Sequence, residues 1–76
     1  MPSYYLNICK AGETTKDLEG FELPSLDAAL KEAEEGAREI AADAIRAGRT
    51  VGEMSIEIAD EHGARLGSVQ LQDIRF

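Results

Sequence analysis

The sequence predicts a small α+β domain in which one long helix packs on a four-stranded, mostly antiparallel sheet. Three observations lead to this prediction. Residues 25–48 have helical periodicity, segments with strand periodicity lie on both sides of them, and the chain has only 76 residues. A chain of this length has material for one small core, so we expect residues 1–76 to form a single domain.

The N-terminal third of the chain predicts two strands. Residues 3–10 alternate between two faces and are rich in strand-forming side chains. A flexible turn at residues 11–13 and a polar stretch follow, and residues 20–23 then predict a short return strand that Pro24 ends. The side chains expected to point toward the core are Tyr4, Leu6, Ile8, Phe21 and Leu23.

The long helix is predicted over residues 25–48 and is marked at both ends. Ser25 is expected to cap the free amides of the first turn, and Asp27 complements the positive end of the helix dipole. Gly48 suits a left-handed residue just past the last turn. Gly36 is unusual inside a helix, since it costs about 1 kcal/mol relative to Ala, and it suggests a close neighbour. The predicted apolar stripe consists of Leu26, Leu30, Ala33, Ala37, Ile40, Ala41, Ala44 and Ile45.

The C-terminal third predicts a second hairpin, which gives the element order β-β-α-β-β. Residues 54–59 alternate between two faces, residues 60–63 are predicted to form a turn, and residues 66–71 are predicted to return as a strand. One helix covers only one face of a sheet, so the other face is expected to meet water. The side chains predicted for this open face are Tyr5, Asn7, Cys9, Ser55, Glu57, Gln70 and Gln72.

Charge and composition exclude several classes of function. Fifteen acidic against eight basic residues give a net charge of -7, the wrong sign for binding a nucleic-acid backbone. The single cysteine, Cys9, has no partner for an internal disulfide, and residues 1–10 lack the pattern of a secretory signal, so we expect a cytoplasmic protein. No apolar run approaches the roughly 20 residues of a membrane span.

The sequence contains no catalytic or metal-binding signature. His62 is the single histidine and falls in a predicted turn, and Cys9 has only Lys10 beside it, so neither is placed with a base or a set of ligands. Residues 60–63 lack the ligand spacing of a calcium loop. We therefore expect no enzyme activity, metal or cofactor. An enzyme would need a partner subunit to complete its site.

Two surfaces are candidates for contact with a partner. One flank of the helix is expected to be self-neutralised by the pairs Asp27–Lys31 and Glu34–Arg38. The other flank carries an uncompensated acidic stripe that either docks a basic partner or serves solubility. The stripe consists of Glu32, Glu35, Glu39 and Asp43. Tyr5 is the second candidate, because its ring is expected on the open sheet face.

Five short motifs are spread over nearly the whole chain. They are Met1-Pro2-x-Tyr4, Asp17-x-x-Gly20-x-Glu22-Leu23-Pro24, Ala29-x-x-Glu32-Ala33, Gly48-Arg49 and Ile56-Glu57-Ile58-x-Asp60-Glu61-x-Gly63. In these motifs the chain resembles a small stand-alone bacterial family of unknown function. The resemblance implies a fold, but it implies no enzymatic reaction. A weaker resemblance, in the Ala- and Glu-rich helix that ends near a Gly, is to antitoxins of the HicB type. The expected function is thus a protein-binding or accessory module that self-associates or docks a second protein. The alternative is an antitoxin-like inhibitor.

Overall fold

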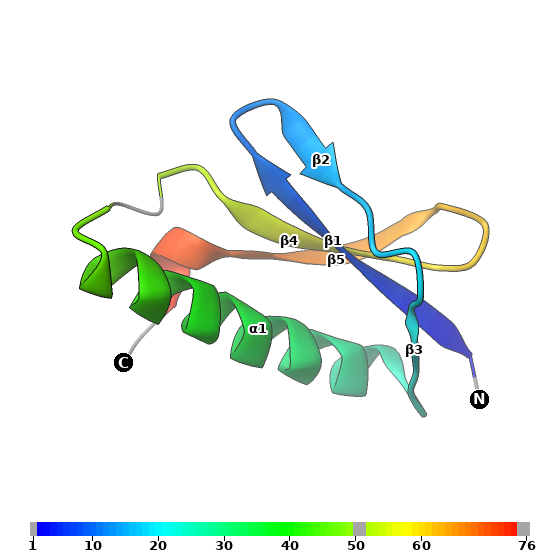
Figure 1. The fold of residues 1–76 in the computed structure, drawn as a ribbon. Coiled ribbons are helices and arrows are strands. Elements are labelled where there is room, and N and C mark those ends of the chain that lie inside the picture. Colours follow the sequence, from blue (N-terminus) through cyan, green and yellow to red (C-terminus); the bar gives the residue numbers. More distant parts are fainter. Residues whose placement is uncertain (1, 50–51, 75–76) are drawn as a thin grey trace.

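The computed structural model describes residues 2–49 and 52–74, which form a helix layer and a sheet layer (Figure 1). The helix α1, Leu26–Arg46, lies along one side of a five-stranded sheet. The strands are β1 (Ser3–Lys10), β2 (Glu13–Thr15), β3 (Phe21–Glu22), β4 (Ser55–Ala59) and β5 (Arg65–Gln70), and a short 3₁₀ helix, η1 (Leu71–Asp73), follows β5. The predicted α+β fold, with strands before and after one helix, is confirmed.

All strand pairs are antiparallel, and the main path across the sheet is β2-β1-β4-β5. The strand β2 pairs with the end of β1, and β3 pairs with its start. The sheet therefore has one strand more than predicted. Sequence periodicity missed β2, because all three of its residues are exposed and polar, and a strand without an apolar face has no alternation to detect.

Asp17, in the connection between β2 and β3, holds this connection against the part of β1 that neither strand pairs with. Its carboxylate oxygen Oδ2 accepts a hydrogen bond from the backbone N–H of Leu6 (3.2 Å), where a neighbouring strand would supply a carbonyl. Its own N–H donates to Oδ1 of Asn7 (2.9 Å). Asp17 Oδ1 also accepts from the N–H groups of Glu19 and Gly20. Gly20 has φ +74, which glycine adopts without strain.

The core lies between α1 and the sheet and is built from small helix residues against large strand residues. Its buried members are Tyr4, Ala29, Ala33, Ala37, Ile56, Ile58 and Leu71. The alanines let the helix backbone approach the sheet closely. The helix packs mainly on β4 and β5 and less on β1. This placement leaves the helix-facing side of β1 only partly covered, and Leu6 and Ile8 are half-buried.

The predicted helix stripe is largely right, with two corrections. Ala29, which the stripe did not include, is fully buried. Ile45, which the stripe did include, is 64% exposed. At 100° per residue the buried alanines extend about 80° to one side of Ala37, at Ala29, but only about 40° to the other, at Ala41. Ile45 lies about 80° from Ala37 on this second side, so its side chain falls on the flank of α1.

Both predicted helix ends are confirmed, with the helix two residues shorter at its C-terminal end. The Ser25 side chain accepts a hydrogen bond from the Ala28 N–H (3.2 Å). At the other end Gly48 has φ +73, and the N–H of Arg49 donates to the carbonyl of Ala44 (2.8 Å). This pattern closes the last turn of α1.

The C-terminal hairpin turns at Asp60, as predicted. Oδ1 of Asp60 accepts from the N–H groups of His62 (2.8 Å) and Ala64 (2.9 Å). The backbone hydrogen bonds from Ala64 and His62 hold the pKa of the Asp60 carboxyl below its ordinary value. Leu71, expected at the end of the last strand, is instead the buried first residue of η1. Among the described residues no helix is long and apolar enough to cross a membrane.

Candidate functional site

The open face of the sheet carries a chain of three polar side chains from three strands. Cys9 on β1 donates its thiol to Oε2 of Glu57 on β4 (3.0 Å). Oε1 of the same carboxylate accepts from Nη1 of Arg65 on β5 (3.0 Å). The register explains this contact, because Cys9 lies opposite Ser55 and Asn7 lies opposite Glu57. The predicted open face is therefore confirmed for Cys9 and Glu57, and its groups satisfy one another.

The pairing keeps Cys9 in the thiol form. The hydrogen bond to Glu57 and partial burial raise the pKa of the Cys9 thiol above its ordinary value. The thiol and Arg65 together lower the pKa of the Glu57 carboxyl. A thiol is a poor nucleophile compared with a thiolate, so Cys9 has the opposite tuning from a reactive cysteine.

We expect Glu57→Gln to increase the alkylation rate of Cys9 by iodoacetamide several-fold at pH 8. Removal of the carboxylate lowers the Cys9 pKa toward its ordinary value, so a larger fraction is thiolate at that pH. The measurement is the rate of mass increase on the intact protein. Glu53→Gln, an exposed carboxylate on the approach to β4, is the control and should leave the rate unchanged. An equal or slower rate in Glu57→Gln would show that the carboxylate does not control the thiol.

His62 lies far from Cys9. It lies three positions after Ala59 in the chain, and Ala59 lies four positions along β4 from Ser55, the residue opposite Cys9. At about 3.3 Å per residue this places the imidazole and the thiol at opposite ends of the sheet. No cluster of three or more His, Cys, Asp or Glu side chains able to hold a metal ion occurs within residues 2–49 and 52–74.

Tyr5, a predicted contact residue, is half-buried at the other end of the open face. Its ring packs on Gly20, where an added Cβ would lie 2.8 Å from Cε2 of Tyr5. Beside it, Leu18 projects from the loop between β2 and β3 and is 90% exposed. Sequence periodicity did not single out Leu18, because one apolar residue in a polar loop forms no pattern.

The four predicted acidic contacts of the helix, Glu32, Glu35, Glu39 and Asp43, are all exposed. Asp43 forms an ion pair with Arg46, so this end of the stripe is compensated. The ion pairs among the described residues are Arg46–Asp43 and Arg65–Glu57. The expected pairs Asp27–Lys31 and Glu34–Arg38 are therefore not formed.

An apolar groove of about 370 Å³ runs between α1 and the edge of the sheet formed by β1 and the β2–β3 connection. It exists because α1 sits over β4 and β5 and leaves the near side of β1 exposed. Sequence patterns predicted a helix packed on the sheet but could not show which strands the helix would cover. The residues that line the groove are Leu6, Ile8, Thr15, Lys16, Asp17, Phe21, Gly36, Ile40 and Ile56.

Gly36 forms part of the helix wall of this groove, and the fold itself does not require a glycine there. Its φ lies in the ordinary helical region. An added Cβ would lie 3.6 Å from Cδ1 of Ile56, an ordinary van der Waals contact. Gly36 thus lowers the stability of α1, and neither its backbone conformation nor its neighbours in the fold require a glycine.

We expect Gly36→Ala to raise the free energy of unfolding by up to about 1 kcal/mol, because alanine has the higher helix propensity and the groove has room for a methyl group. Urea denaturation followed by circular dichroism measures this change. Gly48→Ala is the contrasting control, and it should destabilise, because Gly48 has φ +73. A loss of stability in Gly36→Ala would mean that α1 is closer to β4 than the structure places it.

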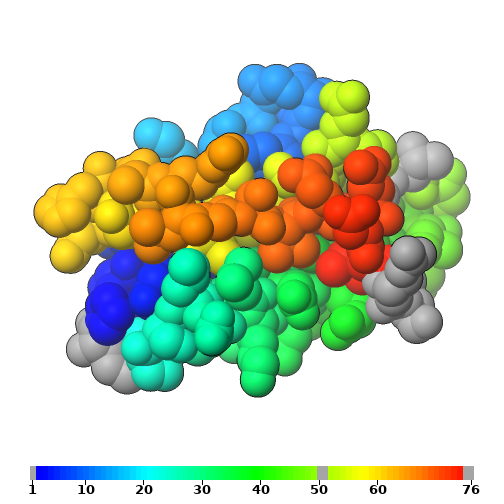
Figure 2. Space-filling model, turned by 180° about the vertical axis from the view of Figure 1, so that it is seen from behind, coloured from blue at the N-terminus to red at the C-terminus, as the bar shows by residue number. Residues whose placement is uncertain are grey.

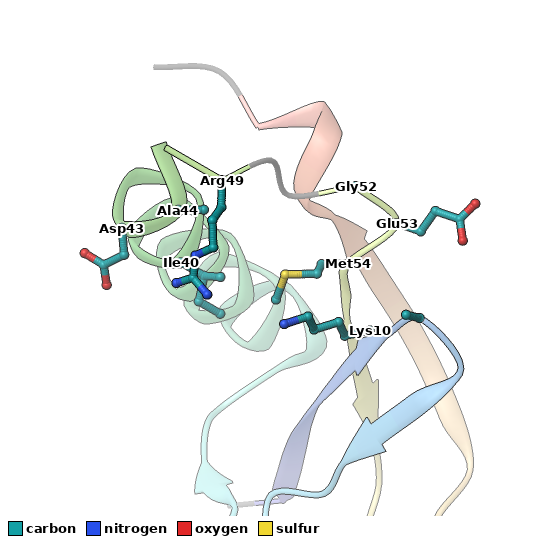
Figure 3. Close-up of a pocket in the computed structure, with 9 residues that line it drawn as sticks. Lys10, Ile40, Asp43, Ala44, Arg49, Gly52, Glu53 and Met54 are labelled. Atoms are coloured by element: carbon teal, nitrogen blue, oxygen red, sulfur yellow. The ribbon is translucent and has the colours of Figure 1, made fainter. Parts of the chain in front are cut away.

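A second hollow, of about 460 Å³, lies at the C-terminal end of α1 beside the ends of β1 and β4 (Figure 3). Lys10 and Arg49 extend into it over an apolar floor that includes Ile40 and Met54, whereas Asp43 and Glu53 point away. Ile40 lines both hollows, so the two adjoin along one side of the helix.

The strand β5 is an unprotected edge of the sheet. In the space-filling view it crosses the face of the molecule with α1 below it and no other segment over it (Figure 2). The N–H of Leu71 donates to the carbonyl of Met54 (3.1 Å), and hydrogen-bonded pairs alternate along an antiparallel ladder. Ser68 and Gln70 therefore direct their backbone N–H and C=O groups outward.

Comparison with known proteins gives one match. Neither the curated proteins nor the solved structures yield a match to the chain. A family model described as a domain of unknown function, DUF6894, matches residues 3–72, from the first residue of β1 into η1. The match spans the fold described above and includes the Asp17 and Gly20 loop, whose roles are structural. The chain belongs to this family of domains of unknown function, DUF6894.

Proposed function

We propose that this protein is a non-enzymatic module that binds another protein through surfaces its own fold leaves uncovered. The observation that carries the proposal is the coverage of the sheet. One helix covers part of one face, and the edge of β5 presents the backbone groups of Ser68 and Gln70, which pair with no strand among the described residues. Exposed edges of this kind accept an added strand in many protein complexes.

The state of the polar groups supports a binding role over a catalytic one. The Cys9 thiol is tied to Glu57, His62 lies at the opposite end of the sheet, and Glu57 is engaged by Arg65 as well. This arrangement offers no activated nucleophile next to a base. The net charge of -7 argues against nucleic acid as the partner, and the free Cys9 fits a reducing cytosolic compartment.

Two more specific roles are alternatives to this proposal. An antitoxin-like inhibitor of the HicB type would also act by binding a protein, but the family match does not point to it. Self-association through β5 is the other, because an edge strand pairs with its twofold mate as readily as with a foreign strand.

The test is a tagged pull-down from the native host with identification by mass spectrometry, using the parent and Ser68→Pro. Proline at this outward-facing position removes one edge donor and leaves the pairing with β4 intact. Light scattering coupled to size exclusion at tens of micromolar detects self-association. We expect a specific partner, or a dimer, with the parent protein. A parent that stays monomeric and recovers no specific protein would refute the interaction role.

A further inference from the structure

We infer that the groove beside α1 seats a basic amphipathic helix of a partner protein. The inference rests on the proposed interaction role and deepens it, since it names the surface and the chemistry of its occupant. Three features of the structure point to this occupant. They are the apolar floor of the groove, an unexplained glycine in its wall and the charge of its helix rim.

The floor of the groove is apolar, and large side chains stay partly uncovered in it. Leu6, Ile8 and Ile40 are half-buried, and Phe21 is 42% exposed at the far wall. Leu6, Ile8 and Ile40 pack against the core and still leave part of their surface uncovered. An apolar surface of this kind gains from contact with apolar side chains of another element.

Gly36, in the helix wall of the groove, favours a partner that packs closely against α1. Gly36 costs helix stability, has an ordinary helical backbone and leaves room for a methyl group within the free protein. A residue without a side chain at this point allows another backbone to approach α1. The sequence left this glycine unexplained, and a partner in the groove explains it.

The backbone next to the groove favours a helix over an added strand. Between β2 and β3 the outward N–H of Leu6 is already engaged by the Asp17 carboxylate (3.2 Å). A strand entering here would find that donor occupied, so side-chain contact must hold the occupant. Helices dock into apolar grooves in this way, through side chains spaced at i, i+3, i+4 and i+7.

The helix side of the groove favours a basic partner, while the opposite wall carries one cation, Lys16. At 100° per residue Glu32 and Glu39 lie within about 60° of Gly36, whereas Lys31 and Arg38 lie on the far flank. Both glutamates are exposed, and neither forms an ion pair among the described residues. Lys10 and Arg49 line the adjoining hollow, which shares Ile40 with the groove, and there they suit the carbonyl end of a partner helix.

A second copy of this chain fits the groove poorly. The apolar face of its α1 is already buried on its own sheet, and the exposed flank of α1 carries the same glutamates. Each copy also carries a net charge of -7. Like charges facing one another across a contact oppose association.

The test uses a displayed library of helical peptides with one randomised face, selected on the whole protein. We expect enriched peptides to carry an apolar stripe flanked by Lys or Arg and a net positive charge. Fluorescence anisotropy of synthetic copies then gives dissociation constants for three variants. Gly36→Trp, which fills the groove, and the double change Glu32→Lys with Glu39→Lys should each weaken binding at least tenfold. Ser68→Trp, on β5 at the open face, should leave it unchanged.

Gly36→Ala provides a variant that keeps the fold. It should stabilise the free protein and at the same time weaken peptide binding several-fold, a combination that a purely structural role for Gly36 does not produce. Acidic or neutral peptides, no enriched peptide, or binding that responds to Ser68→Trp and not to Gly36→Trp would each overturn the groove assignment. In the last case the interaction role stands with β5 as its surface, whereas failure of the pull-down and light scattering refutes that role itself.

Discussion

The Ile58→Ala variant is expected to lose about 2–5 kcal/mol of free energy of unfolding. A domain of this size has roughly 4–11 kcal/mol in total, so much of the stability goes with this one side chain. Ile58 is fully buried on β4, where it lies between Leu6 of β1 and Gly67 of β5 and belongs to the same core cluster as the alanines of α1. Truncation removes apolar contact and leaves a cavity that the sheet cannot close.

Ile45→Ala removes the same atoms from an exposed position and is the matched control. Ile45 is 64% exposed on the flank of α1, so we expect its free energy of unfolding to change by no more than about 0.5 kcal/mol. Urea denaturation of both variants measures the difference. Similar losses at the two positions would mean that the two isoleucines are equally buried, and the placement of α1 would be wrong.

The strongly periodic elements could be predicted from the sequence because one face of each element meets the core and the other face differs from it in polarity. β1, β4 and α1 each turn one apolar face toward the core between helix and sheet, so their large apolar residues recur at intervals of two or of three to four. Ser25 and Gly48 marked the helix ends because each fills a local backbone requirement that no distant contact changes.

The short edge strand β2 could not be predicted in this way, whereas β3 was predicted as the return strand over residues 20–23. β2 exposes all three of its residues, and β3 is two residues long and exposes both. What holds them is backbone pairing with β1 and the hydrogen bonds of Asp17. Hydrogen bonds of this kind depend on which segments meet in space, and a linear pattern of apolar residues does not record that.

The groove beside α1 also has some features that the sequence could predict and others that it could not. The acidic residues and Gly36 stand out in the sequence, because charge spacing and a glycine inside a helix are local signals. The groove between them and Phe21 depends on the sideways position of α1 over β4 and β5, which the packing of its alanines sets. Local signals therefore gave the components of the surface, and only the fold showed that they border one groove.

The Asp17→Ala variant is expected to lose about 2 kcal/mol of free energy of unfolding, because hydrogen bonds to a charged group contribute about 1.5–3 kcal/mol and a buried donor left unpaired is costly. The carboxylate accepts from the N–H groups of Leu6, Glu19 and Gly20, and the Leu6 bond is partly buried. Without it the edge of β1 between β2 and β3 has no acceptor. The loop then no longer holds Gly20 against the ring of Tyr5.

Amide hydrogen exchange makes this prediction specific to the loop. The Leu6 amide should exchange much faster in Asp17→Ala at a pH and denaturant concentration where both proteins are folded, while the amide of Ile58 on β4 keeps its protection. Glu19→Ala removes the same charge two residues away, where the side chain forms no hydrogen bond among the described residues, and should leave both amides and the free energy of unfolding nearly unchanged. If Asp17→Ala and Glu19→Ala behave alike, the loss reflects charge alone, and Asp17 does not replace a strand at the edge of β1.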